Sequence, residues 1–214
     1  MLEHYKTIYE GGEGELVEKK SRFIAHTLPV TSEEEAVAFL NKIKKEYWDA
    51  RHNCHAYTIG KNNECTRCSD DGEPSGTAGR PILDVLREEI HNCIVVVTRY
   101  FGGTLLGTGG LVRAYQAATQ AGLAASTIIE KQFGHKLHVT TDYNGIGKLQ
   151  YLVAQNQIFT LNTQYTDNVT LDLMVPEEKF KDFCTQITEA TSGRAIMVSE
   201  DLEEFGIVDG EIIF

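Results

Sequence analysis

The sequence has no apolar run near the length of about 20 residues that crosses a bilayer. Its amino-terminal stretch, MLEHYKTIYEGGEGE, also lacks the basic, apolar and small-residue regions of a signal peptide. A hydrophobic content of 42% is that of ordinary globular cores, and 214 residues suffice for two modest domains. We therefore expect a soluble, cytoplasmic protein.

Positive charge is scarce: 20 Lys and Arg residues face 31 Asp and Glu residues, which gives a formal net charge of -11. The deficit is uneven, because residues 1–131 contain 15 basic and 18 acidic side chains, whereas residues 132–214 contain 5 and 13. Such an acidic carboxy-terminal part disfavours nonspecific polyanion binding there. Any contact with RNA would need a local basic patch.

The chain has five cysteines, an odd number that argues against a disulfide framework and for reduced thiols. Cys65 and Cys68 have CxxC spacing, but the second CxxC of a typical zinc site is missing. The nearby candidates His52 and Cys54 share one face of a strand-like stretch, while His55 lies on the other. We favour surface thiols and predict no metal. Two further cysteines, Cys93 and Cys184, fall in apolar periodic segments and are expected in the core.

Standard fingerprints of nucleotide binding and of serine nucleophiles are absent as well. The glycine-rich stretch has no P-loop lysine, and Gly107, Gly109 and Gly110 do not fit GxGxxG. Ser75 is not in a GxSxG turn. The sequence therefore gives little support to catalysis, and we predict no cofactor.

What the sequence does contain is an unusual segment, CIVVVTRYFGGTLLGTGGLVRAY, at residues 93–115. Its β-branched run predicts a strand buried on both faces, and a helical apolar pattern begins directly after the glycines. A strand, a glycine loop and a helix start in that order make an anion site, because the first N–H groups of the helix are free. A tight turn with close helix packing is the alternative. The candidate anion ligands are Arg80, Arg99, Gly103, Gly107, Gly109, Gly110 and Arg113, with Lys20 and Arg22 as further phosphate contacts.

A second unusual segment, SDDGEPSGTAGRPIL, occupies residues 69–83. It favours an ordered loop, with a helix beginning near Pro81. Asp70, Asp71 and Glu73 form a candidate acidic site that would bind a divalent cation or act as acid and base. The alternative is an Asp-rich turn that hydrogen-bonds its own backbone, and we favour it.

Periodicity places these segments in an α+β chain. Ser32 and Glu35 have the spacing of a capping box at the start of the first helix. We place the domain boundary after residue 131. Residues 134–205 then read as strand, helix, two strands, helix and strand, the βαββαβ order of a ferredoxin-like domain. Residues 206–214 form a tail that is a candidate edge strand.

The two unusual segments, with KKSRFIAH near the start and RHNCHAYTIG between them, closely resemble the IMPACT family. The two-domain layout resembles its bacterial YigZ branch. The resemblance implies an amino-terminal two-layer βαβ domain, like domain 2 of ribosomal proteins and domain IV of elongation factor G. It also implies a carboxy-terminal domain like domain V of that factor.

The same resemblance implies a role in translational control, because eukaryotic relatives restrain an amino-acid-starvation kinase by competing for its co-activator. The chain departs from the eukaryotic pattern in having no extra amino-terminal interaction domain. For bacterial members of the family a nucleic-acid-binding role has been proposed. Cys65 and Cys68 lie outside the motifs that carry the resemblance.

Our leading hypothesis is a nonenzymatic, translation-linked regulatory protein that engages RNA phosphate, the ribosome or a ribosome-associated protein through the Gly and Arg residues. The competing hypothesis is a metal-dependent phosphotransfer or hydrolytic enzyme, with Asp70, Asp71 and Glu73 holding a cation beside the glycine loop. A third hypothesis treats the glycine loop as a protein docking surface. The oligomeric state is left open.

Overall fold

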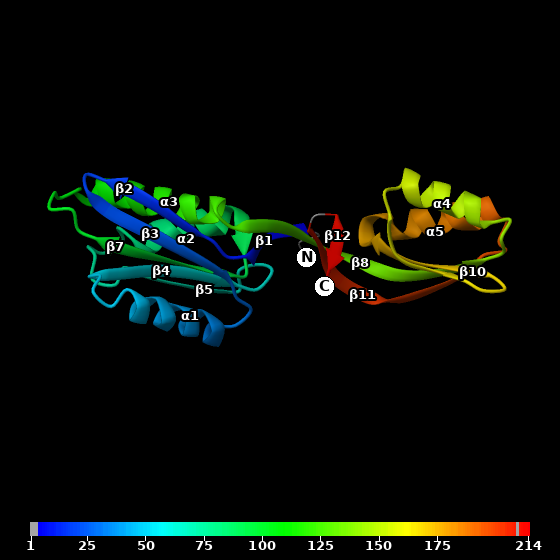
Figure 1. Cartoon of the computed structure of the whole chain (residues 1–214), viewed down its shortest axis with the longest axis horizontal. Coiled ribbons are helices and arrows are strands. Elements are labelled where there is room, and N and C mark those ends of the chain that lie inside the picture. The colour runs from blue at the N-terminus through cyan, green and yellow to red at the C-terminus, as the bar shows by residue number, and fades with distance from the viewer. Residues whose placement is uncertain (1–3, 209) are drawn as a thin grey trace. The chain divides into compact units, whose positions relative to one another are not determined.

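A computed structural model describes residues 4–208 and 210–214 of the chain, which divides into two compact units, Met1–Glu130 and Lys131–Phe214 (Figure 1). Both units combine helices with sheets, which confirms the predicted α+β class. Strand β8 (Thr127–Thr141) runs across the boundary between them. The two units are described separately.

The first unit is built on an antiparallel five-stranded sheet in the order β2-β3-β7-β4-β5. The apolar run Ile94–Val97 lies in its central strand, and all four of these side chains are fully buried. Val95 and Val97 face one hydrophobic core, whereas Ile94 and Val96 face another. The strand is thus buried on both faces, as its sequence predicts. The strands are β2 (Glu13–Glu18), β3 (Ser21–Pro29), β4 (His52–Ile59), β5 (Cys65–Ser69) and β7 (Cys93–Tyr100).

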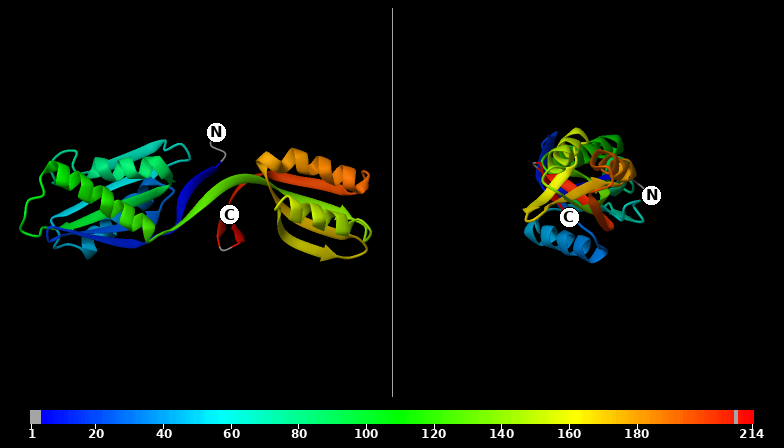
Figure 2. Two further views of the ribbon diagram at one scale, coloured as in Figure 1. Left: turned by 90° about the horizontal axis from the view of Figure 1, so that it is seen from above. Right: turned by 90° about the vertical axis from the view of Figure 1, so that its right-hand side faces the viewer.

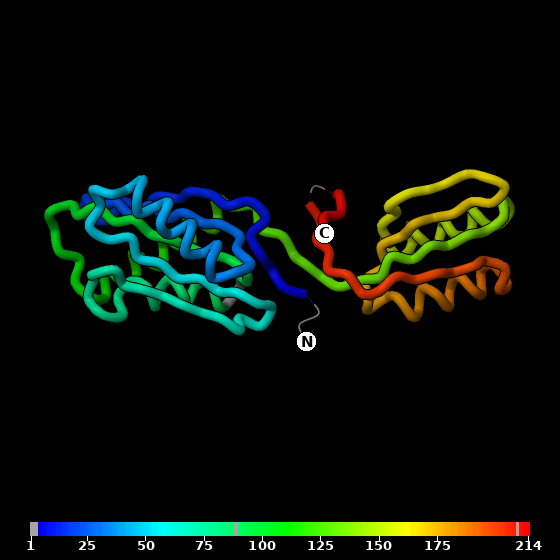
Figure 3. The backbone as a smooth tube through the Cα atoms, turned by 90° about the horizontal axis from the view of Figure 1, so that it is seen from below, coloured from blue at the N-terminus to red at the C-terminus, as the bar shows by residue number. Residues whose placement is uncertain are grey.

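Helices cover both faces of this sheet (Figure 1). The larger core lies between the sheet and the helices α2 (Gly79–Glu89) and α3 (Thr108–Ala124). Helix α1 (Glu33–Glu46) packs across the opposite face, which adds a layer to the two that the family resemblance implied (Figure 3). Outside the sheet, β1 (His4–Glu10) pairs in parallel with the short β6 (Ile90–His91).

The start of α1 follows half of the predicted capping box. The Ser32 hydroxyl accepts a hydrogen bond from the backbone N–H of Glu35 at 3.3 Å. The Glu35 carboxylate, however, accepts from the backbone N–H and the hydroxyl of Thr31, one residue before the cap. The cap therefore satisfies backbone donors on both sides of Ser32.

The second unit has the ferredoxin-like order β8, α4 (Ile146–Gln155), β9 (Phe159–Tyr165), β10 (Val169–Pro176), α5 (Glu177–Thr191) and β11 (Ile196–Val208). Its strands pair in the order β9-β10-β8-β11, and β12 (Glu211–Ile213) adds to the edge of β11. Both helices lie on one face of the sheet (Figure 2), over the alternating Leu137, Val139, Leu171 and Leu173. The other face is open (Figure 3).

Candidate anion site

The glycine-rich segment forms a loop, residues 101–107, between β7 and α3. Gly107 caps the helix with a φ of 72° and no side-chain hydrogen bond. The first bond inside the helix runs from the N–H of Leu111 to the carbonyl of Gly107 at 2.9 Å. The backbone N–H groups of Thr108, Gly109 and Gly110 therefore make no hydrogen bond within the described part of the chain. We call these three N–H groups the α3 amides, and they carry the partial positive charge of the helix start.

The loop approaches the β2–β3 hairpin so closely that one position excludes a side chain. A Cβ atom on Gly102 would lie 2.0 Å from the carbonyl carbon of Lys20. The N–H of Gly102 donates to the Ser21 hydroxyl at 3.1 Å, which ties the loop to the hairpin. Two glycines thus have distinct roles, since Gly102 allows contact with the hairpin and Gly107 allows the left-handed turn into α3.

Beneath this loop the two unusual segments meet in a buried polar network. Glu73, from the second segment, accepts from Arg99 Nη1 at 2.6 Å and from the Tyr115 hydroxyl at 2.8 Å. The Arg99 side chain is 7% exposed and the Glu73 side chain 3%. The Cys54 thiol of β4 donates to the same tyrosine at 3.3 Å. Burial, more than the neighbouring Cys54 and Glu73, raises the pKa of Tyr115, so its hydroxyl stays protonated and donates.

Arg99 is further held between two aromatic rings. Its guanidinium carbon lies 5.3 Å from the centre of the Phe23 ring and 5.7 Å from that of Phe101, within the range of cation–π attraction. Its Nε is buried and has no hydrogen-bond partner among the described residues. An unsatisfied buried donor costs about 1–3 kcal/mol, so this atom is a feature that a bound acceptor would explain.

A pocket of about 400 Å³ opens above this network, which we call the Arg99 pocket. Arg99 and Glu73 line it together with the start of α3 and the turn before β4, where Arg51 is exposed and His52 half-buried. The Nδ1 of His52 lies 2.9 Å from the carbonyl of Asp71, which holds the ring in place. Two apolar side chains complete the rim: Phe101 is 48% exposed and Leu105 83%. The lining residues are Arg51, His52, Glu73, Pro74, Arg99, Phe101, Leu105, Leu106, Gly107, Thr108 and Leu111.

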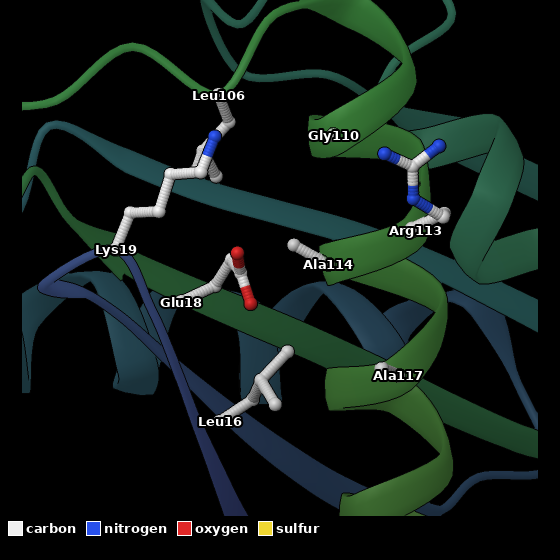
Figure 4. A pocket seen from close by; sticks show the side chains of 8 residues that line it. All are labelled: Leu16, Glu18, Lys19, Leu106, Gly110, Arg113, Ala114 and Ala117. Carbon is white, nitrogen blue, oxygen red and sulfur yellow. The ribbon is translucent and has the colours of Figure 1, made fainter.

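A second pocket, which we call the hairpin pocket, lies between β2 and α3 (Figure 4). In this view Lys19 reaches from the hairpin toward Leu106, and Arg113 extends from the other side of the helix. Glu18 also places a carboxylate there, which offsets part of the positive charge of Lys19 and Arg113. Its other lining residues are Leu16, Gly110, Ala114 and Ala117.

The remaining predicted anion ligands have different placements. The guanidinium of Arg113 lies over the first turn of α3, with one nitrogen 3.5 Å from where a Cβ of Gly109 would stand. Gly103 has a φ of 86° and open space around it. Arg80 lies on α2, where its Nε donates to Asp84 at 2.7 Å, and it lines neither pocket. Arg22 pairs with Glu15 at 2.9 Å.

The carboxylates of the acidic segment have separate partners. Asp70 accepts hydrogen bonds from the backbone N–H groups of Gly76, Ala78 and Gly79, and so fixes the loop at the start of α2. Partial burial opposes its ionisation, but these three donors outweigh burial and lower the pKa of its carboxyl. This is the backbone-bonded Asp turn that the sequence favours.

Asp71 binds Lys44 Nζ at 2.8 Å and the backbone N–H of Asn53 at 2.7 Å. Burial raises the pKa of its carboxyl, but the bonds to Lys44 and to this N–H outweigh burial and lower it. Glu73 belongs to the buried network. Within residues 4–208 and 210–214, no three His, Cys, Asp or Glu side chains are grouped as a metal ion would require.

The cysteines are dispersed. Cys54 is buried, and desolvation raises the pKa of its thiol to about 12. Cys65 donates to Glu33 at 3.0 Å, while Cys68 is exposed on the same strand. That strand, β5, pairs antiparallel with β4. Of the two expected core thiols, Cys93 is fully buried, and Cys184 is partly buried against the second unit's core.

Sequence reasoning missed Arg51, Lys19 and Phe101 as pocket residues. Arg51 immediately precedes the histidine-rich strand and Phe101 begins the glycine loop, so adjacency to the motifs was the signal that was available. Lys19 had a weaker signal, the basic pair that opens the motif KKSRFIAH. None of the described helices has both the length and the apolar composition that a membrane span requires.

Comparison with known proteins places both units in described families. Residues 19–123 match the model of the Impact N-terminal domain, and residues 139–194 match a domain of unknown function (DUF1949). The IMPACT family member YvyE of Bacillus subtilis is 42% identical, over 91% of this chain and 90% of its own length. The family member YigZ of Escherichia coli is 34% identical, over 82% of this chain and 87% of its own length.

More distant relatives share a shorter region. A Dictyostelium discoideum protein named Protein IMPACT homolog is 35% identical over 47% of this chain and 30% of its own length. Among solved structures, the crystal structure of a hypothetical protein is 29% identical and covers 94% of this chain and 99% of that chain, with a TM-score of 0.58.

Proposed function

Because this chain belongs to the IMPACT family, and because its two unusual segments meet below the start of α3, we propose that it is a nonenzymatic regulatory protein that binds RNA phosphate. The link to translation rests on the family resemblance of those segments. The observation that supports the phosphate site is the set of three unbonded α3 amides beside the Arg99 pocket.

The chemistry of the site suits a phosphate group. Backbone N–H groups at a helix start donate to phosphate oxygens, and the helix dipole favours the negative charge. Arg51 at the rim and Arg113 over the first helical turn supply full positive charges near these amides. Arg99 is neutralised by Glu73, so it contributes hydrogen-bond donors more than net charge.

This proposal is tested with fluorescently labelled single-stranded RNA and the full-length chain. The variant Arg51→Glu/Arg113→Glu should bind at least tenfold more weakly, and its slope of log affinity against log salt should fall by roughly 0.7 per lost phosphate contact. The matched control Lys42→Glu/Lys45→Glu makes the same charge change on α1, on the other face of the sheet. Equal losses in both variants, or no RNA binding by the unmutated protein, would contradict the proposal. Binding of a ribosomal protein without RNA would favour a protein partner instead.

A further inference from the structure

The Arg99 pocket combines a phosphate site with an exposed aromatic ring, a feature that the proposed function does not use. The Phe101 ring is 48% exposed and Leu105 is 83% exposed, and both line the pocket that contains Gly107 and Thr108. Exposed apolar side chains cost solvation in the free protein, so two of them at the rim of a polar pocket indicate a ligand with an apolar face. Phosphate alone has no such face.

The Phe101 ring also makes a cation–π contact with Arg99. Arg99 lies 5.7 Å from the centre of the ring, and the Arg99 guanidinium is itself fixed by Glu73 at 2.6 Å. The Phe101 ring therefore contacts the buried guanidinium of Arg99, while part of its surface is exposed to solvent. An exposed aromatic side chain next to backbone phosphate donors is the arrangement that proteins use to stack an unpaired base.

A second observation separates this pocket from a bare helix start. Arg99 is more than nine-tenths buried and lines the pocket, and its Nε lacks a partner among the described residues. This Nε is covered in the free protein, so an acceptor atom of a bound nucleotide would satisfy it once the surrounding side chains of the pocket move.

We propose that the Arg99 pocket binds single-stranded RNA, with one unpaired base stacked against Phe101 and Leu105 while the adjoining phosphate contacts the α3 amides and Arg51. This inference rests on the proposed function and deepens it, because it names the RNA class. In a duplex the faces of the bases are covered by their neighbours, so only an unpaired nucleotide can present both a base face and its phosphate to the pocket.

The test compares two RNAs at equal salt with the full-length chain: an unstructured single strand, and the blunt-ended duplex that the same strand forms with its complement. We expect the unstructured RNA to bind at least tenfold more tightly. Phe101→Ala should weaken its binding by roughly tenfold, in line with the usual contribution of one stacked base. Phe101→Tyr should retain binding because it keeps the ring, which separates stacking from general damage to the pocket. Tyr151→Ala is the matched control, since it removes a ring that is 67% exposed on α4.

Three results would overturn the inference. Equal affinity for both RNAs would show that no unpaired base is read. Unchanged binding by Phe101→Ala, with the loss caused by Arg51→Glu/Arg113→Glu retained, would leave the phosphate site in place and remove the stacked base. Absence of binding to either RNA would remove both this inference and the proposed function.

Discussion

At the scale of single residues, the buried pair of Arg99 and Glu73 joins the two unusual segments beneath the start of α3. The sequence suggested Arg99 as an anion ligand and Glu73 as part of an acidic site, and nothing in a spacing of 26 residues indicates that they meet. Their pairing depends on the loop that Asp70 fixes and on the packing of α3, which places the Tyr115 hydroxyl on the same carboxylate oxygen. Residue types were readable from the sequence, whereas such long-range pairings were not.

Removing the Glu73 carboxylate should be far more damaging than breaking a surface ion pair. We expect Glu73→Ala to lower the free energy of unfolding by about 3–5 kcal/mol, because it leaves the Arg99 charge buried and uncompensated. Asp84→Ala is the control, since it breaks the exposed pair with Arg80 and should cost less than about 1 kcal/mol. Urea denaturation of the full-length chain measures both values, and similar small losses would contradict the role of the buried pair.

At the scale of elements, periodic segments were predictable and irregular ones were not. The alternation in β10 and the buried run in β7 identified those strands, and the helical spacing after the glycines identified α3. Strand β5 was missed because the Asn and Cys residues around it are typical of a turn. Its antiparallel pairing with β4, which the local sequence does not show, makes this segment a strand. The layer formed by α1 could not be deduced from the sequence either. The apolar stripe of α1 predicts that the helix is buried on one side, but it does not indicate which face of the sheet the helix covers.

The β2–β3 hairpin contains a strained turn that bears on the site. Its two central residues, Lys19 and Lys20, have φ values of 45° and 67°, a region that favours Asn-Gly. Left-handed backbone costs roughly 1–2 kcal/mol per residue outside glycine. Strain of this kind is often retained where side chains have a function. Lys19 lines the hairpin pocket, next to the start of α3.

Replacing this pair by Lys19→Asn/Lys20→Gly should therefore separate stability from binding. We expect the free energy of unfolding to rise by about 1–2 kcal/mol as the strain is relieved. RNA affinity should fall several-fold because the variant loses two positive charges, one of them on Lys19 beside the start of α3. Denaturation and fluorescence anisotropy test the two effects. Loss of stability would contradict the strain, and a gain in affinity would contradict the role of the lysines in RNA binding.

At the scale of the whole molecule, the two units differ in charge and in chemistry. Residues 1–130 contain 14 basic and 18 acidic side chains, whereas residues 131–214 contain 6 and 13. The RNA contacts that we propose all lie in the first unit, whose deficit of positive charge is smaller.

On the open sheet face of the second unit, His138 lies 2.7 Å from Asp172 and 2.9 Å from Glu200.

This histidine should make stability depend on pH. The hydrogen bond to Asp172 and then that to Glu200 raise the pKa of His138 above its usual value. Its stabilising effect is fully present below the unfolded pKa of about 6.5 and is lost as pH rises through the higher folded pKa. The melting temperature of the unmutated chain should therefore exceed that of His138→Gln by more at about pH 5.5 than at about pH 8.5. Asp172→Asn should reduce this difference, and a difference that grows with pH would refute the assignment.

The central claim is that the three α3 amides hold a phosphate group, and an amide-resolved NMR titration of the full-length chain with unstructured RNA tests it most directly. We predict that the resonances of Thr108, Gly109 and Gly110 shift in proportion to bound RNA, and that these shifts disappear in Arg51→Glu/Arg113→Glu. RNA binding that leaves these three amides unshifted while other parts of the chain respond would contradict the account.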